Sequence, residues 1–275
     1  MVLEKLVRLG YATKGAVYGL IGILALETAF GVGGKTTDSS GALLTIASQP
    51  FGKFLLIVIA IGLAGYAIWR LIETFIDPEN KGTDAKGIGA RIGYLSSGIA
   101  YSALSIEAAS LALRANRSSG NGNSTADWTA RVMAQPFGRW LVGLAGAIAI
   151  GVGLYLMYKA YKVKFRRKMD LSELSTEQEK LLVQVCRFGV AARGLVFMAI
   201  GFFILQAAYQ VDPNEVRGLD GVLQAFAAQP FGKVLLAFVA LGLVAYAIYL
   251  LVQARYLRLK ADEVEDDIES KIPFR

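Results

Sequence analysis

Gln229-Pro-Phe-Gly232 is a four-residue motif that occurs twice more along the chain, at Gln49–Gly52 and Gln135–Gly138. An Arg-x-Gly motif precedes each copy, and the distance from its arginine to the glutamine is 41, 44 and 42 residues in turn. Chance rarely places two such motifs in register three times. The sequence therefore predicts one unit of about 90 residues written three times, the mark of a repeat architecture.

Long apolar runs accompany both motifs. Four are free of charges: Phe54–Trp69, Trp140–Tyr158, Gly194–Val211 and Val234–Ala254. Two more, from Gly15 and from Ile92, are each interrupted by one glutamate. A helix needs ~20 residues to cross the hydrocarbon of a bilayer. We therefore predict an all-α integral membrane protein with six transmembrane helices, arranged as three two-helix repeats around a pseudo-threefold axis normal to the membrane.

The domain organisation follows from the same anchors. We expect repeat 1 over residues 1–80, repeat 2 over 81–162, a cytoplasmic basic and amphipathic linker over 163–186, repeat 3 over 187–260, and an acidic C-terminal tail over 261–275. Proline favours the first turn of a helix, so Gln-Pro should mark the start of each second span.

Two kinds of short segment lie between the spans. The apolar stretch 41–48 and its counterparts are too short to span, so we predict interfacial helices lying on the membrane, with an irregular loop as the alternative. In the linker, Ser175 and Gln178 have capping-box spacing. They predict a short amphipathic helix on the inner leaflet, before span five.

Small residues within the runs indicate close helix packing. Gly15 and Gly19, and Gly62 and Gly65, fit the faces at which membrane helices approach one another. Aromatic residues at the inner helix ends are typical of an interfacial belt; they are Tyr11, Trp69, Tyr94, Tyr155, Tyr158, Tyr246 and Tyr249.

The charge distribution predicts an orientation. Six spans put both termini on one side, and that side carries 21 of the 29 Lys and Arg residues when Lys14 and Arg193 are assigned to it. The positive-inside rule then places both termini in the cytoplasm. The net charge of +7 is explained by anionic lipid headgroups as partners, without nucleic acid.

The composition argues against most enzyme chemistry. The chain has no His and a single Cys, which removes the usual ligands of zinc and haem and the usual Cys–His and Ser–His dyads. Aspartate or glutamate chemistry has no motif to support it. We predict a non-enzymatic protein with no cofactor, no metal site and no catalytic residues.

The third repeat carries a family resemblance. Its sequences Arg187–Phe197, Gly218–Val222, Gln229–Gly232 and Gln253–Tyr256 resemble a bacterial membrane family defined only as a domain of unknown function, number 1206. The family is similar in having three two-helix repeats over the whole chain. The second repeat matches least, since Ser97 replaces the basic residue at Lys14 and Arg193. The resemblance implies fold and membrane location but no activity.

Two glutamates inside predicted spans are candidate functional residues. A charge within a span costs roughly 2.5–3.5 kcal/mol on insertion scales. Glu107 lies about 24 Å along its helix from Arg91, at 1.5 Å per residue, and is a candidate proton-relay or cation site. The alternative is a carboxylate paired with Arg114 or reaching outer water. Glu27 aligns with two polar residues of the other repeats, so the three either surround the axis or cap loop backbone.

Five basic residues at the inner helix ends are candidate contacts for an anion or a lipid phosphate on the axis: Arg8, Lys14, Arg91, Arg187 and Arg193. Arginine suits bidentate phosphate binding. Snorkelling to the cytoplasmic interface explains each residue separately, and the repeated Arg-x-Gly can also brace neighbouring repeats.

Three functions remain on the sequence alone. A structural or accessory membrane protein that binds lipids or a membrane protein partner is favoured, because four of the spans are almost free of polar residues. A transporter or channel for a small solute or ion along the axis is the alternative. An enzyme is the least supported. Helix-packed Glu107 and Arg-x-Gly arginines would argue against transport.

Overall fold

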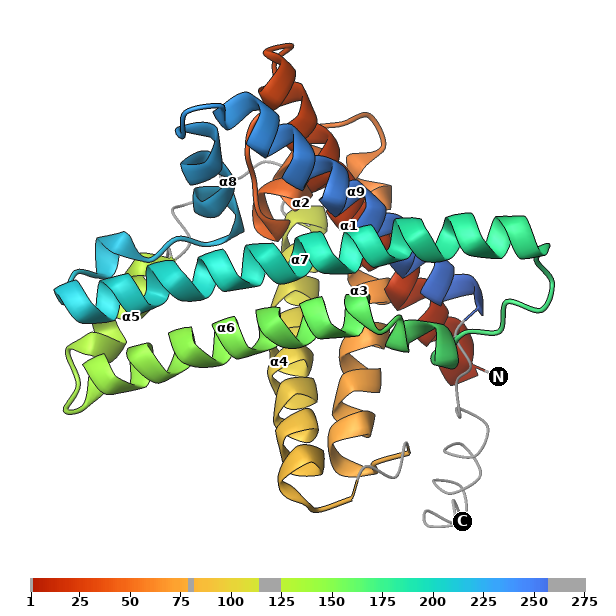
Figure 1. Ribbon diagram of the computed structural model, residues 1–275, viewed down its shortest axis with the longest axis horizontal. Coiled ribbons are helices and arrows are strands. Elements are labelled where there is room, and N and C mark those ends of the chain that lie inside the picture. Colours follow the sequence, from red (N-terminus) through yellow and green to blue (C-terminus); the bar gives the residue numbers. More distant parts are fainter. Residues whose placement is uncertain (1, 79–81, 114–124, 257–275) are drawn as a thin grey trace.

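The computed structural model describes residues 2–78, 82–113 and 125–256. Within these ranges six long helices dominate (Figure 1): α1 (Val2–Phe30), α3 (Gly52–Phe75), α4 (Ala85–Leu113), α6 (Gly138–Tyr161), α7 (Thr176–Gln210) and α9 (Gly232–Tyr256). Short helices precede the second long helix of each repeat: α2 (Ser39–Ala47), α5 (Thr125–Met133) and α8 (Leu219–Ala227). Two 3₁₀ turns, η1 (Lys164–Lys168) and η2 (Pro213–Glu215), complete the described elements. The described chain is thus all-helical, as predicted.

Five of the six predicted spans are long and apolar enough to cross a membrane: α1 from Glu4 onwards, α3, α6, α7 and α9. The sixth, α4, has 29 residues and is therefore long enough. Its five serines and Glu107 make it more polar than the others. The sequence prediction of six spans is thus supported for five of them.

The long helices pack in a cyclic order across the repeats. The second helix of each repeat lies against the first helix of the next, so that α3 packs on α4, α6 on α7, and α9 on α1. Within repeats 1 and 3 the two long helices also pack together, as α1 with α3 and α7 with α9. In repeat 2 the described parts of α4 and α6 do not pack on each other, although they cross in the view of Figure 1. The predicted pseudo-threefold ring is therefore incomplete at repeat 2.

Glycines allow the close approaches, as the sequence indicates. A Cβ added at Gly22 would lie 3.0 Å from the backbone nitrogen of Val244, and one at Gly15 would lie 3.2 Å from the carbonyl of Ala247. One at Gly62 would lie 2.2 Å from Oγ1 of Thr13. The glycine faces of α1 and α3 are thus packing surfaces, toward α9 and α1 respectively.

The Gln-Pro-Phe-Gly motif forms the same tight turn in all three repeats. The glycine amide donates to the glutamine carbonyl at 2.9, 2.9 and 2.7 Å. Phenylalanine occupies the left-handed region each time, with φ of 63°, 64° and 63°, as the third residue of a type II turn requires. The long helix begins at the glycine. The prediction that Pro lies in the first helical turn is therefore wrong, because Pro occupies the second position of the turn instead.

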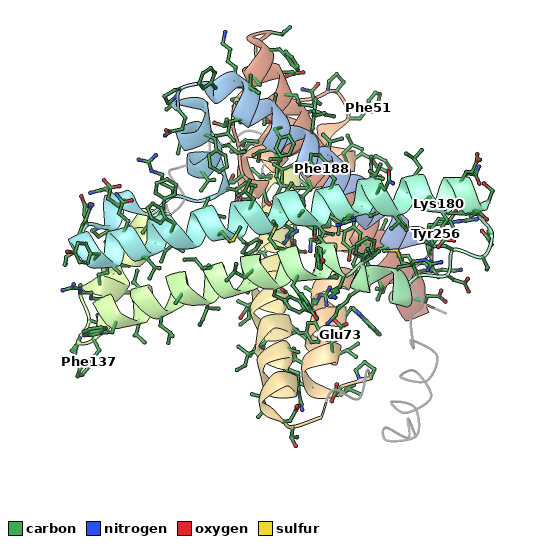
Figure 2. The ribbon with its side chains drawn as sticks, viewed as in Figure 1. Phe51, Glu73, Phe137, Lys180, Phe188 and Tyr256 are labelled. Carbon is green, nitrogen blue, oxygen red and sulfur yellow. The ribbon has the colours of Figure 1, made fainter. Side chains whose placement is uncertain are left out.

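Only glycine fits at the end of this turn. A Cβ at Gly52, Gly138 or Gly232 would lie 2.3, 1.8 or 2.0 Å from a carbonyl oxygen of the preceding short helix. The phenylalanines themselves project outward, with Phe51 83% and Phe137 79% exposed, and Figure 2 shows both at the periphery. The motif is thus a structural junction.

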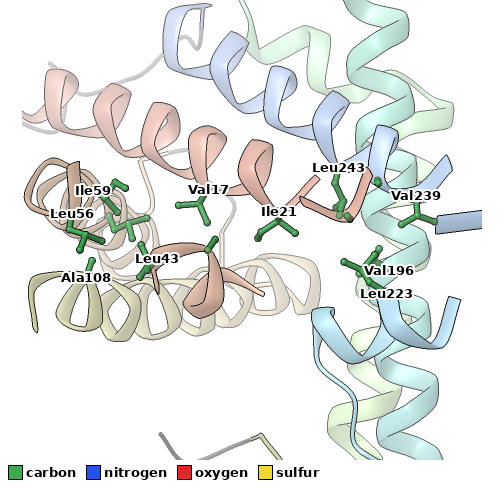
Figure 3. Packing of buried hydrophobic residues seen from close by; sticks show 14 of the residues in the cluster. Val17, Ile21, Leu43, Leu56, Ile59, Ala108, Val196, Leu223, Val239 and Leu243 are labelled. Carbon is green, nitrogen blue, oxygen red and sulfur yellow. The ribbon is translucent and has the colours of Figure 1, made fainter. Parts of the chain in front are cut away.

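The short segments are helices, which confirms the helical prediction over the loop alternative. They do not simply lie on the surface, because Leu43 of α2 and Leu223 of α8 are fully buried. Both join the central apolar cluster shown in Figure 3, together with Val17, Ile21 and Leu243. Each of these two helices therefore inserts one apolar edge between the long helices.

The linker between repeats 2 and 3 differs from its prediction. The capping box of Ser175 and Gln178 is present, but the helix it starts runs without a break to Gln210 as α7. There is no separate amphipathic helix, since nothing interrupts the helical hydrogen bonds before the span. Phe165 of η1 is buried against Tyr249 of α9. The predicted acidic tail lies outside the described residues.

Gly232→Ala is expected to lower the thermal stability of the detergent-solubilised protein. Its Cβ would meet the Ala227 carbonyl at 2.0 Å, and overpacking of this kind destabilises by ~1–3 kcal/mol. Gly143→Ala is the matched control, because its Cβ would lie 3.8 Å from the Cβ of Ala208, an ordinary contact. Equal melting temperatures for the two variants would contradict the assigned role of the turn.

Candidate binding site: a buried cluster of cations and tyrosines

Lys14 lies buried between three helices, with 5% of its surface exposed. Its Nζ donates to Oη of Tyr66 on α3 at 3.0 Å. The same atom is 4.5 Å from the ring centroids of Tyr66 and of Tyr101 on α4. The ammonium group therefore has aromatic and hydroxyl neighbours, and within the described residues it makes no ion pair.

Arg193 of α7 occupies the equivalent position in repeat 3. Its guanidinium carbon lies 4.8, 5.3 and 4.4 Å from the ring centroids of Tyr18, Phe197 and Tyr246. Its Nη1 is buried and has no hydrogen-bond partner in the described part of the chain. A buried donor without an acceptor is costly, so this nitrogen lacks an acceptor that the described residues do not provide.

Arg70 and Glu73 of α3 add a paired charge beside Lys14. Arg70 donates to Glu73 at 2.6 Å, to Oη of Tyr66 at 2.8 Å and to Oη of Tyr11 at 3.0 Å. Glu73, labelled in Figure 2, is 5% exposed. This carboxylate forms its ion pair with Arg70. It is therefore not the counter-ion of Arg193.

Lys159 of α6 completes what we call the cation–tyrosine cluster. Its Nζ donates to Oη of Tyr249 on α9 at 3.0 Å. Every one of the six long helices contributes, with these members: Tyr11, Lys14, Tyr18, Tyr66, Arg70, Glu73, Tyr94, Tyr101, Lys159, Arg193, Tyr246 and Tyr249. Four basic side chains and one carboxylate leave the cluster with an excess of positive charge.

The electrostatics of the cluster favour an anion. Arginine keeps its charge in any protein environment, so Arg193 cannot lower its burial energy by losing a proton. Cation–π contacts return ~0.5–2 kcal/mol each against roughly 2.5–3.5 kcal/mol for a charge within a span, and they supply no opposite charge. A phosphate or carboxylate oxygen near Arg193 would supply both the charge and the missing acceptor.

The Arg-x-Gly arginines lie at helix ends rather than in the cluster. Arg8 donates to the carbonyls of Ala254, at 2.9 Å, and of Arg255, and pairs with Glu4 at 2.8 Å. Arg91 donates to the Thr74 carbonyl at 2.6 Å. Each thus binds the carboxyl end of the preceding repeat's second helix, where the helix dipole attracts cations.

Arg187 does not repeat this contact. Its side chain is exposed and has no partner among the described residues. The structure thus divides the five candidates: Lys14 and Arg193 meet in the cluster, Arg8 and Arg91 bind helix ends, and Arg187 does neither.

Glu107 of α4 is held by a helix of repeat 1. Its Oε2 accepts a hydrogen bond from Oγ of Ser40 at 2.8 Å, in the first turn of α2. The carboxylate therefore lies near a helix N-terminus, which stabilises negative charge. Arg114, the partner considered from the sequence, lies outside the described residues.

Glu27 lies at the other end of the molecule from the cluster, in a shallow hollow that it lines with Leu24, Lys35, Leu44 and Ser48. Its side chain is exposed. Gln206, its counterpart in repeat 3, instead donates to Glu215 of η2 at 3.3 Å. Each of these two aligned residues therefore lies against the loop region of its own repeat.

Sequence reasoning missed Arg70, Glu73 and Lys159 as site residues and placed the tyrosines elsewhere. Trp69 and Tyr249, with Tyr11 and Tyr246, are buried rather than in an interfacial belt, whereas Tyr155 and Tyr158 are exposed. The prediction of a belt is wrong for the buried four, because they pack inside the helical bundle; Tyr11 lies against Tyr66, and Tyr249 lies against Phe165. The sequence does carry a signal for Glu73 and Lys159. Each lies 24 residues after the anchoring glutamine of its repeat, and this position is polar in all three repeats.

The described residues contain no group of three His, Cys, Asp or Glu side chains arranged as a metal site. Cys186 is buried against apolar neighbours. The cluster offers hydrogen-bond donors and positive charge.

The fold and the cluster together define a class: an all-helical protein with helices of membrane-spanning length and an internal threefold repeat. The model of the family described as Domain of Unknown Function (DUF1206) matches residues 9–77, 92–163 and 188–257. The chain belongs to this family. It is 38% identical over 250 residues to the "Uncharacterized protein YxxB" of Bacillus subtilis (strain 168), covering 90% of this chain and 89% of that protein. No solved structure is significantly similar.

Arg8→Met is expected to destabilise the protein, because it leaves carbonyls of Ala254 and Arg255 without their charged donor. Hydrogen bonds from charged groups contribute ~1.5–3 kcal/mol. Arg187→Met changes the equivalent arginine, which has no partner among the described residues. It should change the free energy of unfolding by no more than ~0.5 kcal/mol. Equal losses in thermal unfolding for both variants would argue against the helix-end role.

Proposed function

We propose that this chain is a non-enzymatic protein of the bacterial plasma membrane that crosses it six times and binds anionic lipid headgroups from the cytoplasmic side. The observation that carries the proposal is Arg193, a permanently charged and partly buried side chain among aromatic rings. Its Nη1 is fully buried and has no acceptor among the described residues. A lipid phosphate is the abundant membrane component that supplies the missing charge.

Six crossings require α4 to span the membrane as well. Its 29 residues extend about 43 Å at 1.5 Å per residue, and two of its five serine hydroxyls have partners. Ser96 donates to the Ile92 carbonyl at 3.0 Å, and Ser105 donates to the Ala60 carbonyl of α3 at 2.8 Å. A serine bonded in this way adds little cost within a bilayer.

The arrangement of the helix ends supports the proposed orientation. In Figure 1 the N-terminal end of α1 lies at the lower right, that of α4 at the bottom and that of α7 at the right, whereas α5 and α8 lie at the left and upper left. The first group of ends belongs to the side with most of the basic residues. The positive-inside rule then assigns that side, and both termini, to the cytoplasm.

Transport along the axis has less support. Glu107 is bonded to Ser40, and Arg8 and Arg91 are bonded to helix ends. A relay carboxylate or an anion vestibule would need these side chains free to meet a solute. The contacts instead favour a binding role, which a membrane protein partner of the chain can share.

The test is lipid-dependent stability of the delipidated protein in neutral detergent. Dioleoylphosphatidylglycerol should raise the melting temperature by roughly 5–10 °C at a hundredfold excess over Kd, which corresponds to ~2.7 kcal/mol. Dioleoylphosphatidylcholine should not. Inorganic phosphate in a parallel titration distinguishes a free anion from a lipid headgroup: a full response to phosphate and none to phosphatidylglycerol would overturn the lipid part of the proposal.

Arg193→Met and Lys14→Met should abolish the response to phosphatidylglycerol. Without lipid they should be at least as stable as the wild type, because each removes a buried charge that has no counter-ion. Arg139→Met and Lys53→Met are the matched controls, because both residues are exposed and lie on the side opposite to the termini. Variants that respond to phosphatidylglycerol as the wild type does would refute the proposed site.

A further inference from the structure

Repeat 2 departs from the other two at the positions that join its helices. A Cβ added at Gly10 would lie 2.7 Å from the Cβ of Tyr66, and one at Gly189 would lie 2.3 Å from the nitrogen of Tyr246. Their counterpart is Gly93, where an added Cβ meets nothing within 4 Å. The glycine is present in α4, but α6 does not contact it.

The α6 side of repeat 2 is equally unoccupied. Gly65 is packed on Leu6, with an added Cβ 3.1 Å from the leucine Cβ. The counterparts of this pair are Gly151 and Gly89, and an added Cβ at either one meets nothing within 4 Å. Both helices of repeat 2 therefore present glycines to space that no part of the described chain fills.

Ile148 explains why repeat 2 stays open. The residue equivalent to Ile148 is Gly62 in repeat 1 and Gly242 in repeat 3. A Cβ added at Gly62 would lie 2.2 Å from Oγ1 of Thr13, and one added at Gly242 would lie 2.1 Å from the Cβ of Ala192. A real isoleucine side chain cannot occupy that place, so α4 and α6 cannot close as the other pairs do. Ile148 is instead 58% exposed.

The two helices of repeat 2 that do not pack together both border the cation–tyrosine cluster. Tyr66 and Tyr246 close the cluster within repeats 1 and 3, whereas repeat 2 has the smaller Val152, which is exposed. The two unpacked helices each contribute to the cluster, since Tyr101 of α4 faces Lys14 and Lys159 of α6 bonds Tyr249. The third basic position is Ser97, so the side without a closing tyrosine also lacks its own cation.

We infer that an anionic diacyl phospholipid enters the cluster laterally, between α4 and α6, which Ile148 keeps apart. The inference rests on the proposed function and adds the path to the site. The lining suits this occupant at both ends, because Ile92, Ile99 and Ile148 are exposed apolar side chains for acyl chains and Lys14 and Arg193 attract the phosphate. Arg193 lies about 9 Å beyond Arg187 along α7, so a phosphate bound to it lies deeper than that arginine.

Blocking the open side should remove the bound lipid without affecting the fold. Gly93→Leu with Gly151→Leu fills space that is unoccupied, so the double variant should fold and should retain at least tenfold less phosphatidylglycerol after detergent purification, measured by mass spectrometry. Ala147→Leu is the control: it places a leucine at an exposed position of α6 where the other repeats have Ile61 and Leu241.

The outcomes separate the inference from the proposed function. Loss of lipid in the double leucine variant and in Arg193→Met, but not in Ala147→Leu, supports both. Retention in the double leucine variant with loss in Arg193→Met overturns lateral entry and leaves the proposed function intact. Retention in Arg193→Met overturns both.

A crosslinking experiment tests the role of Ile148 directly. In a Cys186→Ala background, Gly89→Cys and Gly151→Cys should remain unlinked under oxidation while Ile148 is present. Adding Ile148→Gly should allow α4 and α6 to approach as α1 and α3 do, within the Cβ separation of ~3.8 Å that a disulfide requires, and should lower the retained lipid tenfold. Complete crosslinking with Ile148 in place would overturn the inference.

Discussion

The structure depends on how positive charge is accommodated inside a bundle of apolar helices. Arg193 and Lys14 lie among helices of membrane-spanning length, where an unpaired charge is unfavourable. Tyrosines surround both groups, and Arg70 takes up the nearby carboxylate of Glu73. Replacing two cations by apolar residues would give a simpler core, and their presence therefore requires a reason beyond packing.

Close packing around this charge is the second constraint. Glycines at the crossings of α1 with α3 and of α7 with α9 bring the backbones at Tyr66 and Tyr246 close to the opposite helix. The Gln-Pro-Phe-Gly turns set where each second helix begins, and they leave the phenylalanine exposed at the far side. In repeat 2 the same framework carries Ile148, Val152 and Ser97, so one side of the cluster is left unclosed.

Much of this architecture is readable from the sequence, and particular residues show why the rest is not. The repeat anchors predict three helical hairpins and three short helices, and the Ser175 capping box predicts where α7 begins. The turn was misassigned because Phe51, Phe137 and Phe231 adopt a conformation that usually needs glycine. The unbroken α7 also went unpredicted, since a basic linker looks like a boundary.

The candidate site was only partly predictable for a different reason. Lys14 and Arg193 are visible as basic residues near apolar runs, but burial depends on what faces them from other repeats. Tyr101 reaches Lys14 from α4, and Tyr18 reaches Arg193 from α1, which are contacts between segments far apart in sequence. Likewise, only a structure reveals that Gly93 and Gly151 have no neighbour on the other helix of repeat 2 within the described residues.

The most direct measurement is native mass spectrometry of the wild-type chain released from nanodiscs with equal amounts of phosphatidylglycerol and phosphatidylcholine. A buried site with excess positive charge predicts one phosphatidylglycerol retained per chain at collision energies that remove the detergent and loosely bound lipid. A bare chain under those conditions, or phosphatidylcholine retained as often as phosphatidylglycerol, would contradict the account.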